Sequence, residues 1–146
     1  MDTINILIID GQGGGIGKNL IYGIKSNIKF FSDKKINIIG AGTNELASKN
    51  MKLAGSDIAI YGEQNIIKYI NYSHIISGVI GILAPFGIKG EITPKIAEAI
   101  FKSNSSKIMV PMNKCNIKIA IKNDLLKNHI DIAINMICEE IKNIQN

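Results

Sequence analysis

"LIIDGQGGGIGKNLI", residues 7–21, is the stretch that decides the fold. Aliphatic residues lead into Asp10, five glycines follow within seven positions, and apolar residues at helical spacing come next. Glycine is entropically costly to order, and a simple tight turn needs only one or two glycines. A strand, a glycine-rich turn and a helix start place bare backbone amides at the positive end of a helix, where anions bind. The stretch therefore predicts a strand–turn–helix unit that holds a phosphate group.

Short apolar runs and helical segments continue to alternate along the whole chain. Strands are predicted at residues 4–9, 36–39, 58–60, 75–83 and 107–110. Helices are predicted at residues 16–28, 43–54, 63–70, 93–101 and 124–144. Such alternation is typical of a three-layer, doubly wound α/β fold with a mainly parallel sheet. We expect one Rossmann-like domain over residues 1–146 with strand order 3-2-1-4-5.

Three helix starts and one edge strand carry their own signals. Asn44 and the pair Thr93-Pro94 are typical first residues of a helix, and Asp124 is expected to cap the last one. Residues 117–121 alternate isoleucine with lysine or alanine, a period-two pattern with one wetter face. The link from residue 110 to 117 is too short for a helical crossover. We therefore expect a sixth strand that runs antiparallel to the fifth.

The glycine spacing separates the phosphate-binding motifs. The P-loop pattern GxxxxGK fails, because Gln12 stands at its first glycine and Asn19 at its hydroxyl position. The plain GxGxxG pattern also fails. Gly11, Gly15 and Gly17 fit GxxxGxG, which resembles the cofactor turn of short-chain dehydrogenases. The chain lacks the Tyr-x-x-x-Lys pair of those enzymes, and no acid follows the second strand to hold a ribose, so a dehydrogenase is not favoured.

The predicted ligand site is the rim where the strands end. Loops at the carboxyl ends of parallel strands meet there, and they carry function in this fold class. The glycine loop would hold a phosphate, Thr43 and Asn44 would meet the sugar or a second phosphate, and the loop after the fourth strand would close the pocket. The candidate binding residues are Asp10, Gly11, Gln12, Gly13, Gly14, Gly15, Ile16, Gly17, Lys18, Thr43, Asn44, Gly62, Glu63 and Asn113.

Two carboxylates are the candidates for catalysis. Asp10 and Glu91 could each act as acid, base or metal ligand. The alternatives are that Asp10 binds the amides of its own turn and that Glu91 caps a helix or faces solvent. Cys115 is expected to be a small buried residue rather than a nucleophile. The two cysteines and two histidines lack metal-ligand spacing, so no metal site is predicted.

Composition excludes several classes of protein. The chain has 34 isoleucines, 17 lysines spread along its length and no arginine, so its net charge of +5 does not indicate a nucleic-acid binder. Residues 69–88 lack charged side chains, but polar residues, proline and glycines interrupt them, so no membrane span is expected. Two cysteines outside any disulfide pattern and the absence of a signal peptide predict a cytoplasmic protein.

Five segments together resemble a known family. They are "IDGQGGGIGK", "GTN", "YGEQN", "GEITP" and "PMNKCN". They are similar to a family of small, uncharacterised bacterial proteins that is described only as a domain of unknown function. The resemblance runs along nearly the whole chain and implies a Rossmann-like domain in a cytoplasmic bacterial protein. It implies no activity.

Three functional hypotheses follow from these residues. The first is a protein that binds a nucleotide, dinucleotide or other phosphate-bearing ligand at the glycine loop. The second is a small enzyme that acts on such a ligand, with Asp10 or Glu91 in the reaction. The third is a homodimeric assembly protein with a vestigial site, whose apolar residues 80–88 form the interface.

Overall fold

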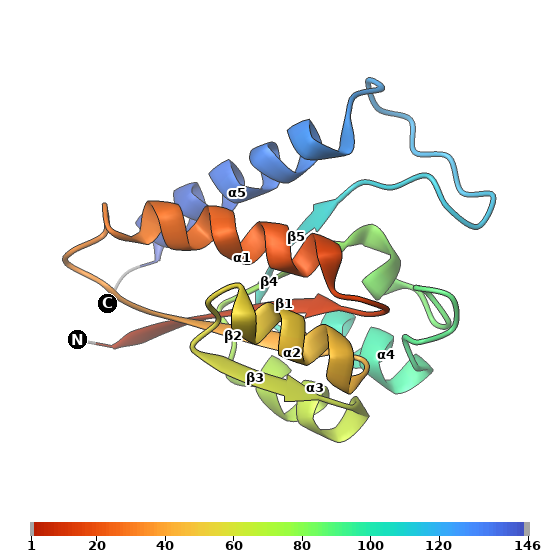
Figure 1. Ribbon diagram of the computed structural model, residues 1–146, viewed down its shortest axis with the longest axis horizontal. Coiled ribbons are helices and arrows are strands. Elements are labelled where there is room, and N and C mark those ends of the chain that lie inside the picture. The colour runs from red at the N-terminus through yellow and green to blue at the C-terminus, as the bar shows by residue number, and fades with distance from the viewer. Residues whose placement is uncertain (1, 145–146) are drawn as a thin grey trace.

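The computed structural model describes residues 2–144, which fold as a five-stranded parallel sheet with helices on both faces (Figure 1). The strands are β1 (Thr3–Asp10), β2 (Lys35–Gly42), β3 (Ile58–Tyr61), β4 (Ile75–Val79) and β5 (Ser106–Val110). The helices are α1 (Gly15–Ile28), α2 (Glu45–Leu53), α3 (Glu63–Ile70), the 3₁₀ turn η1 (Ile80–Leu83), α4 (Pro94–Lys102) and α5 (Leu126–Asn143). The sheet order is β3-β2-β1-β4-β5, so the predicted order is confirmed.

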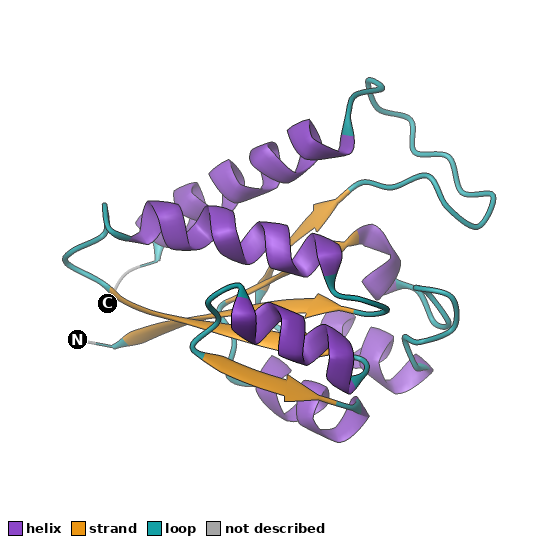
Figure 2. Ribbon diagram, in the orientation of Figure 1, coloured by secondary structure: helices purple, strands orange, loops and turns teal. Residues whose placement is uncertain are grey.

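The sheet separates two apolar cores. Helices α1, α2 and α5 cover one face, and α3, α4 and η1 cover the other (Figure 2). Successive side chains of a strand point to opposite faces, so Ile4, Ile6 and Ile8 of β1 enter the first core and Leu7 and Ile9 enter the second. A strand that is buried on both faces reads as a continuous apolar run, which explains the sequence before the glycines.

Two of the predicted helix starts are confirmed. Asn44 precedes α2, and its side-chain oxygen accepts a hydrogen bond from the amide of Ala47 at 2.8 Å. Thr93 precedes α4 and caps the amide of Ile96 at 3.2 Å, and Pro94 occupies the first helical position. Both caps satisfy amides that a helix leaves without a partner, and both fix where the chain leaves the rim of the sheet.

The fourth strand is shorter than predicted. It ends at Val79, and Ile80–Leu83 forms the 3₁₀ turn η1. Ile82 is fully buried in this turn, as it would be in a strand. The prediction of a strand to residue 83 was wrong because a continuous apolar run does not distinguish a buried strand from a short buried helix.

Residues 117–121 do not form the predicted antiparallel strand. Cys115 and Asn116, with φ of 54° and 61°, turn the chain in the left-handed region. The amide of Ile119 then bonds the side-chain oxygen of Asn113 at 2.9 Å instead of a neighbouring strand. Residues 111–125 extend away from the sheet as a long loop (Figure 1). The alternating pattern indicates that these side chains suit a half-buried strand. It does not predict the backbone turn that directs the segment away from the sheet edge.

The last helix begins slightly later than predicted. Leu125 is the residue before α5, so the prediction of Asp124 as its cap was wrong. The carboxylate of Asp124 accepts hydrogen bonds from the Leu125 amide and the Asn128 side chain, both at 2.7 Å. It therefore orders the approach to the helix without binding the amides of its first turn.

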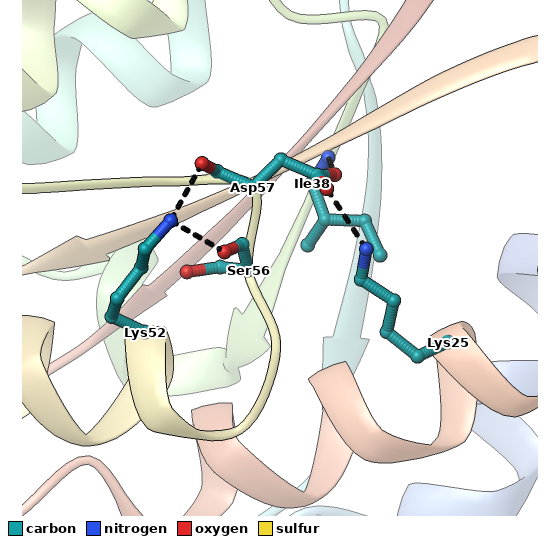
Figure 3. Close-up of polar contacts among 5 residues, drawn as sticks. All are labelled: Lys25, Ile38, Lys52, Ser56 and Asp57. Carbon is teal, nitrogen blue, oxygen red and sulfur yellow. Dashed lines mark hydrogen bonds and ion pairs between the residues drawn. The ribbon is translucent and has the colours of Figure 1, made fainter.

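An ionic cluster joins two helices to the amino end of β3, away from the rim (Figure 3). Asp57 accepts from the Lys25 ammonium at 2.9 Å and from the Ile38 amide at 2.8 Å. The Lys52 ammonium donates to the carbonyl oxygens of Ser56 and Asp57. The Lys25–Asp57 pair is about one third exposed, at 31% and 38%, so its contribution to stability is of order 1 kcal/mol or less. Together, the contacts of this cluster connect α1 and α2 to β2 and to the start of β3.

Candidate functional site

The candidate site lies at the carboxyl end of the sheet, where the strand order reverses. The chain builds β2 and β3 on one side of β1, and it then returns to build β4 and β5 on the other. Asp10 and Gly42 are register partners at the ends of β1 and β2, so the glycine loop (residues 11–17) lies beside Thr43 and Asn44. The loop after η1 reaches the same end of the sheet (Figure 1). Ligands of doubly wound sheets bind at this reversal point.

Asp10 binds the amides of its own loop. One carboxylate oxygen accepts from the Gly11 amide and the other from the Gly17 amide, both at 2.7 Å. Gly17 is the third residue of α1, so Asp10 caps this helix. Only 7% of Asp10 is exposed, and this burial raises the pKa of its carboxyl group. Hydrogen bonds from the backbone amides of Gly17, Gly11 and Ile16 lower the pKa and the charge of Glu91 raises it, but burial dominates.

Three of the five glycines are explained by packing within the protein. A Cβ at Gly17 would lie 2.7 Å from the Met51 sulfur, and a Cβ at Gly11 would lie 2.8 Å from the Thr43 hydroxyl. Gly14 has a φ of 72°, and its Cβ would lie 2.9 Å from the carbonyl oxygen of Ala47. Close approach thus requires Gly11 and Gly17, and backbone conformation together with close approach requires Gly14.

Gly13 and Gly15 are not explained in this way. A Cβ built at either position meets nothing within 4 Å, and neither residue has a positive φ. Within residues 2–144, the amides of Gly13 and Gly15 form no hydrogen bond with another protein group, and both residues are exposed. The left-handed position at the tip of the loop is taken by Gln12, with a φ of 48°. The protein itself therefore gives no reason for the absence of a side chain at these two positions.

Glu91 enters the same loop from the other side of the rim. Its Oε1 accepts from the Thr43 hydroxyl at 2.7 Å, the Asn44 amide group at 2.8 Å and the Gln12 backbone amide at 3.1 Å. Among residues 2–144, its Oε2 accepts only from the same Gln12 amide, at 3.2 Å. Burial raises the pKa of Glu91, but these hydrogen bonds together outweigh it, so the pKa lies below its usual range. Glu91 is thus held as a carboxylate by Thr43 and Asn44, the residues predicted to meet the ligand.

The loop that carries Glu91 has an unusual backbone. Phe86, Ile88 and Lys89 have φ values of 63°, 51° and 50°, and Gly90 follows with 88°. Left-handed conformations of residues other than glycine are uncommon, and they persist only where surrounding contacts impose them. Sequence reasoning missed this feature, because only Gly90 marks it in the sequence. The conformation places Glu91 against the glycine loop.

The structure separates some predicted residues from the glycine loop. Glu63 accepts from the Thr93 hydroxyl at 2.6 Å, so with Gly62 it connects the end of β3 to the start of α4. The Lys18 ammonium lies 5.9 Å from the centre of the Tyr22 ring, along α1. Asn113 lines a hollow of about 300 Å³ in the loop between β5 and α5. Its neighbours there are Pro111, Met112, Ile119, Ile121, Lys122, Asn123, Asp124, Leu126 and His129.

One contact of the glycine loop was not predicted. The Asn50 side chain, in the middle of α2, donates to the carbonyl oxygen of Gly13 at 2.8 Å. Asn50 thus binds a carbonyl group on the exposed side of the loop, while Asp10 binds amides on its buried side. No sequence signal marks Asn50, because its role depends on how α1 and α2 dock.

Metal-ligating and nucleophilic groups do not gather at this rim. Across residues 2–144, no three side chains of histidine, cysteine, aspartate or glutamate lie close enough to hold a metal ion. Cys115 is exposed, so the expectation that it is buried was wrong, because it lies in the loop that replaces the predicted sixth strand. In the same described range, no helix is long and apolar enough to cross a lipid bilayer.

The two carboxylates should respond to pH in opposite directions. The pKa of Asp10 is raised on folding, so the pH-dependent part of its contribution to stability is present below about pH 3.9 and is lost as pH rises through the folded pKa. The pKa of Glu91 is lowered, so its contribution is present above about pH 4.3 and is lost as pH falls through the folded pKa. The stability advantage of the wild type should therefore fall with rising pH against Asp10→Asn, and fall with decreasing pH against Glu91→Gln.

Urea denaturation of the three proteins between about pH 3 and pH 7 measures both differences. Opposite slopes support the assigned environments. A common slope for both pairs would contradict them.

Comparison with known proteins gives a family but no activity. No curated protein and no solved structure matches the chain at a significant level. Residues 5–142 match the family described as domain of unknown function DUF3842. The match covers the strands from the third residue of β1 onward, the glycine loop and the loop that carries Glu91. The chain therefore belongs to the DUF3842 family, as its sequence segments indicated.

Proposed function

We propose that this protein binds a nucleotide, a dinucleotide or another phosphate-bearing ligand at the glycine loop. The observation that carries the proposal is the pair Gly13 and Gly15. Apart from chain neighbours and the backbone of the same helix, no atom of the described residues lies within 4 Å of a Cβ at either position. The absence of side chains at these two exposed positions favours a ligand that approaches the backbone closely.

The electrostatics of the loop support an anionic ligand on its outer side. The amides of Gly13 and Gly15 stand at the amino end of α1, where the helix dipole is positive. Asp10 already binds the amides of Gly11 and Gly17 from the buried side, so an anion has only the exposed amides available. Lys18 adds an exposed positive charge in the first turn of the same helix, although its ammonium lies near the Tyr22 ring.

The geometry favours binding over catalysis by Asp10. Both oxygens of Asp10 accept amide hydrogen bonds, and the residue is almost fully buried. A general acid or base must reach the proton that it transfers.

The homodimer stays a prediction. A charged residue in place of Ile88 could disrupt an interface formed by residues 80–88. The Ile88 side chain also lies 2.9 Å from the Cβ position of Gly11, so this substitution would disturb the glycine loop as well.

Backbone amide NMR with pyrophosphate tests the proposal. We expect saturable shifts of the Gly13 and Gly15 signals at up to millimolar concentrations of pyrophosphate, because these amides would donate to the phosphate oxygens. The Gly55 amide, in the turn after α2, donates to the carbonyl oxygen of Lys52 at 3.0 Å and serves as the internal control. Loop signals that stay unchanged up to about 10 mM pyrophosphate would contradict the proposal.

A further inference from the structure

No acidic residue follows β2 directly in the sequence, but the fold brings the Glu91 carboxylate to the end of this strand. In doubly wound folds that bind nucleotides, a carboxylate near the end of the second strand accepts hydrogen bonds from ribose hydroxyls. The residues that follow β2 are Thr43 and Asn44, which are neutral. Both donate to Glu91, which the loop after η1 brings to this point.

The two oxygens of Glu91 differ in what they have left to accept. Oε1 accepts from Thr43 and Asn44, and it shares the Gln12 amide with Oε2. Oε2 has a single contact, to the Gln12 amide at 3.2 Å. A carboxylate oxygen can accept about two hydrogen bonds, so Oε2 retains capacity for a hydroxyl donor.

The surroundings of Glu91 hold its carboxylate in one place. Gly11 has no side chain, and a Cβ there would lie 3.2 Å from Oε1 of Glu91. The left-handed backbone of Ile88, Lys89 and Gly90 delivers the residue to the glycine loop. A fixed, ionised acceptor beside a phosphate-binding loop discriminates between ligands by their hydroxyl groups, because a ligand without the hydroxyl loses one hydrogen bond to a charged group.

We infer that Oε2 of Glu91 accepts a hydrogen bond from the 2′- or 3′-hydroxyl of a ribose, and that the ligand of this site is therefore a ribonucleotide rather than a simple phosphate. The inference rests on the proposed function, because it needs a phosphate at the glycine loop to position the sugar. Glu91 is in this account a specificity-determining residue for the ligand.

Calorimetric titration with ADP, 2′,3′-dideoxy-ADP and pyrophosphate tests the inference. We expect wild-type protein to bind ADP about tenfold more tightly than the dideoxy nucleotide, the effect of one hydroxyl–carboxylate hydrogen bond. In Glu91→Ala the two nucleotides should bind equally. The control Glu98→Ala removes an exposed carboxylate of α4, which pairs with Lys102, and should keep the tenfold preference.

The outcomes separate the inference from the proposed function. If wild-type protein binds pyrophosphate but binds both nucleotides equally, the inference is overturned and the proposed function stands. If Glu91→Ala binds all three compounds more tightly, Glu91 occupies the phosphate position itself and the inference is overturned. If none of the three compounds binds to the wild type, the proposed function fails and the inference fails with it. The comparison of the two nucleotides on the wild type needs no variant to fold.

Discussion

Replacing Asp10 with alanine is expected to lower the free energy of unfolding by about 3 kcal/mol, because two buried amides lose their acceptor. Those amides belong to Gly11 and Gly17, and each bonds Asp10 at 2.7 Å. Burial of the carboxylate opposes its charged form, as its raised pKa shows, but an amide left buried without any partner is costlier still. Asp10→Asn keeps one acceptor oxygen and should lose less than Asp10→Ala.

Urea denaturation at neutral pH measures these losses. Asp131→Ala is the matched control, because Asp131 is exposed on α5, and it should change stability by no more than about 0.5 kcal/mol. An Asp10→Ala variant that loses less than about 1 kcal/mol would show that the hydrogen bonds of Asp10 do not hold the glycine loop.

The double variant Gly13→Ala/Gly15→Ala is expected to keep a stable fold and to bind pyrophosphate more weakly. Nothing lies within 4 Å of either Cβ position, so the folded state should accept both methyl groups. Stability should stay unchanged or rise by up to about 1 kcal/mol, because alanine restricts the unfolded chain. Affinity for pyrophosphate should fall by about tenfold or more, since the methyl groups keep the phosphate away from the exposed amides.

Gly14→Ala is the matched control in the same loop. Its φ of 72° and the carbonyl of Ala47 at 2.9 Å make this substitution strained. We expect it to lower the free energy of unfolding by roughly 1–3 kcal/mol. If Gly13→Ala/Gly15→Ala destabilises the protein as much as Gly14→Ala does, the two glycines serve the fold, and the argument for a ligand is lost.

The order of the sheet could be predicted because it depends on local patterns. Continuous apolar runs mark the buried strands, and Asn44 and Thr93 mark helix starts that their capping bonds confirm. Once strands and helices alternate, the handedness of parallel crossovers leaves few possible orders. The rim and the place of the glycine loop on it follow from that order.

The role of Glu91 could not be predicted, because all of its partners are distant in sequence. Thr43 and Asn44 lie 48 and 47 positions away, and Gln12 lies 79 positions away. The contact depends on a left-handed run at Ile88 and Lys89 that residue types alone do not announce. The prediction of a strand at residues 117–121 was wrong for a related reason. Their side-chain pattern suits a strand, but the turn at residues 115–116 directs them away from the sheet edge.

The central claim is that Gly13 and Gly15 are bare because a phosphate group lies against them. Calorimetric titration of pyrophosphate into the wild type and into Gly13→Ala/Gly15→Ala, with unfolding curves of both proteins, tests it most directly. The account predicts equal or higher stability of the variant together with an affinity that is lower by about tenfold or more. Equal affinity of the two proteins for pyrophosphate, or no binding by the wild type, would contradict it.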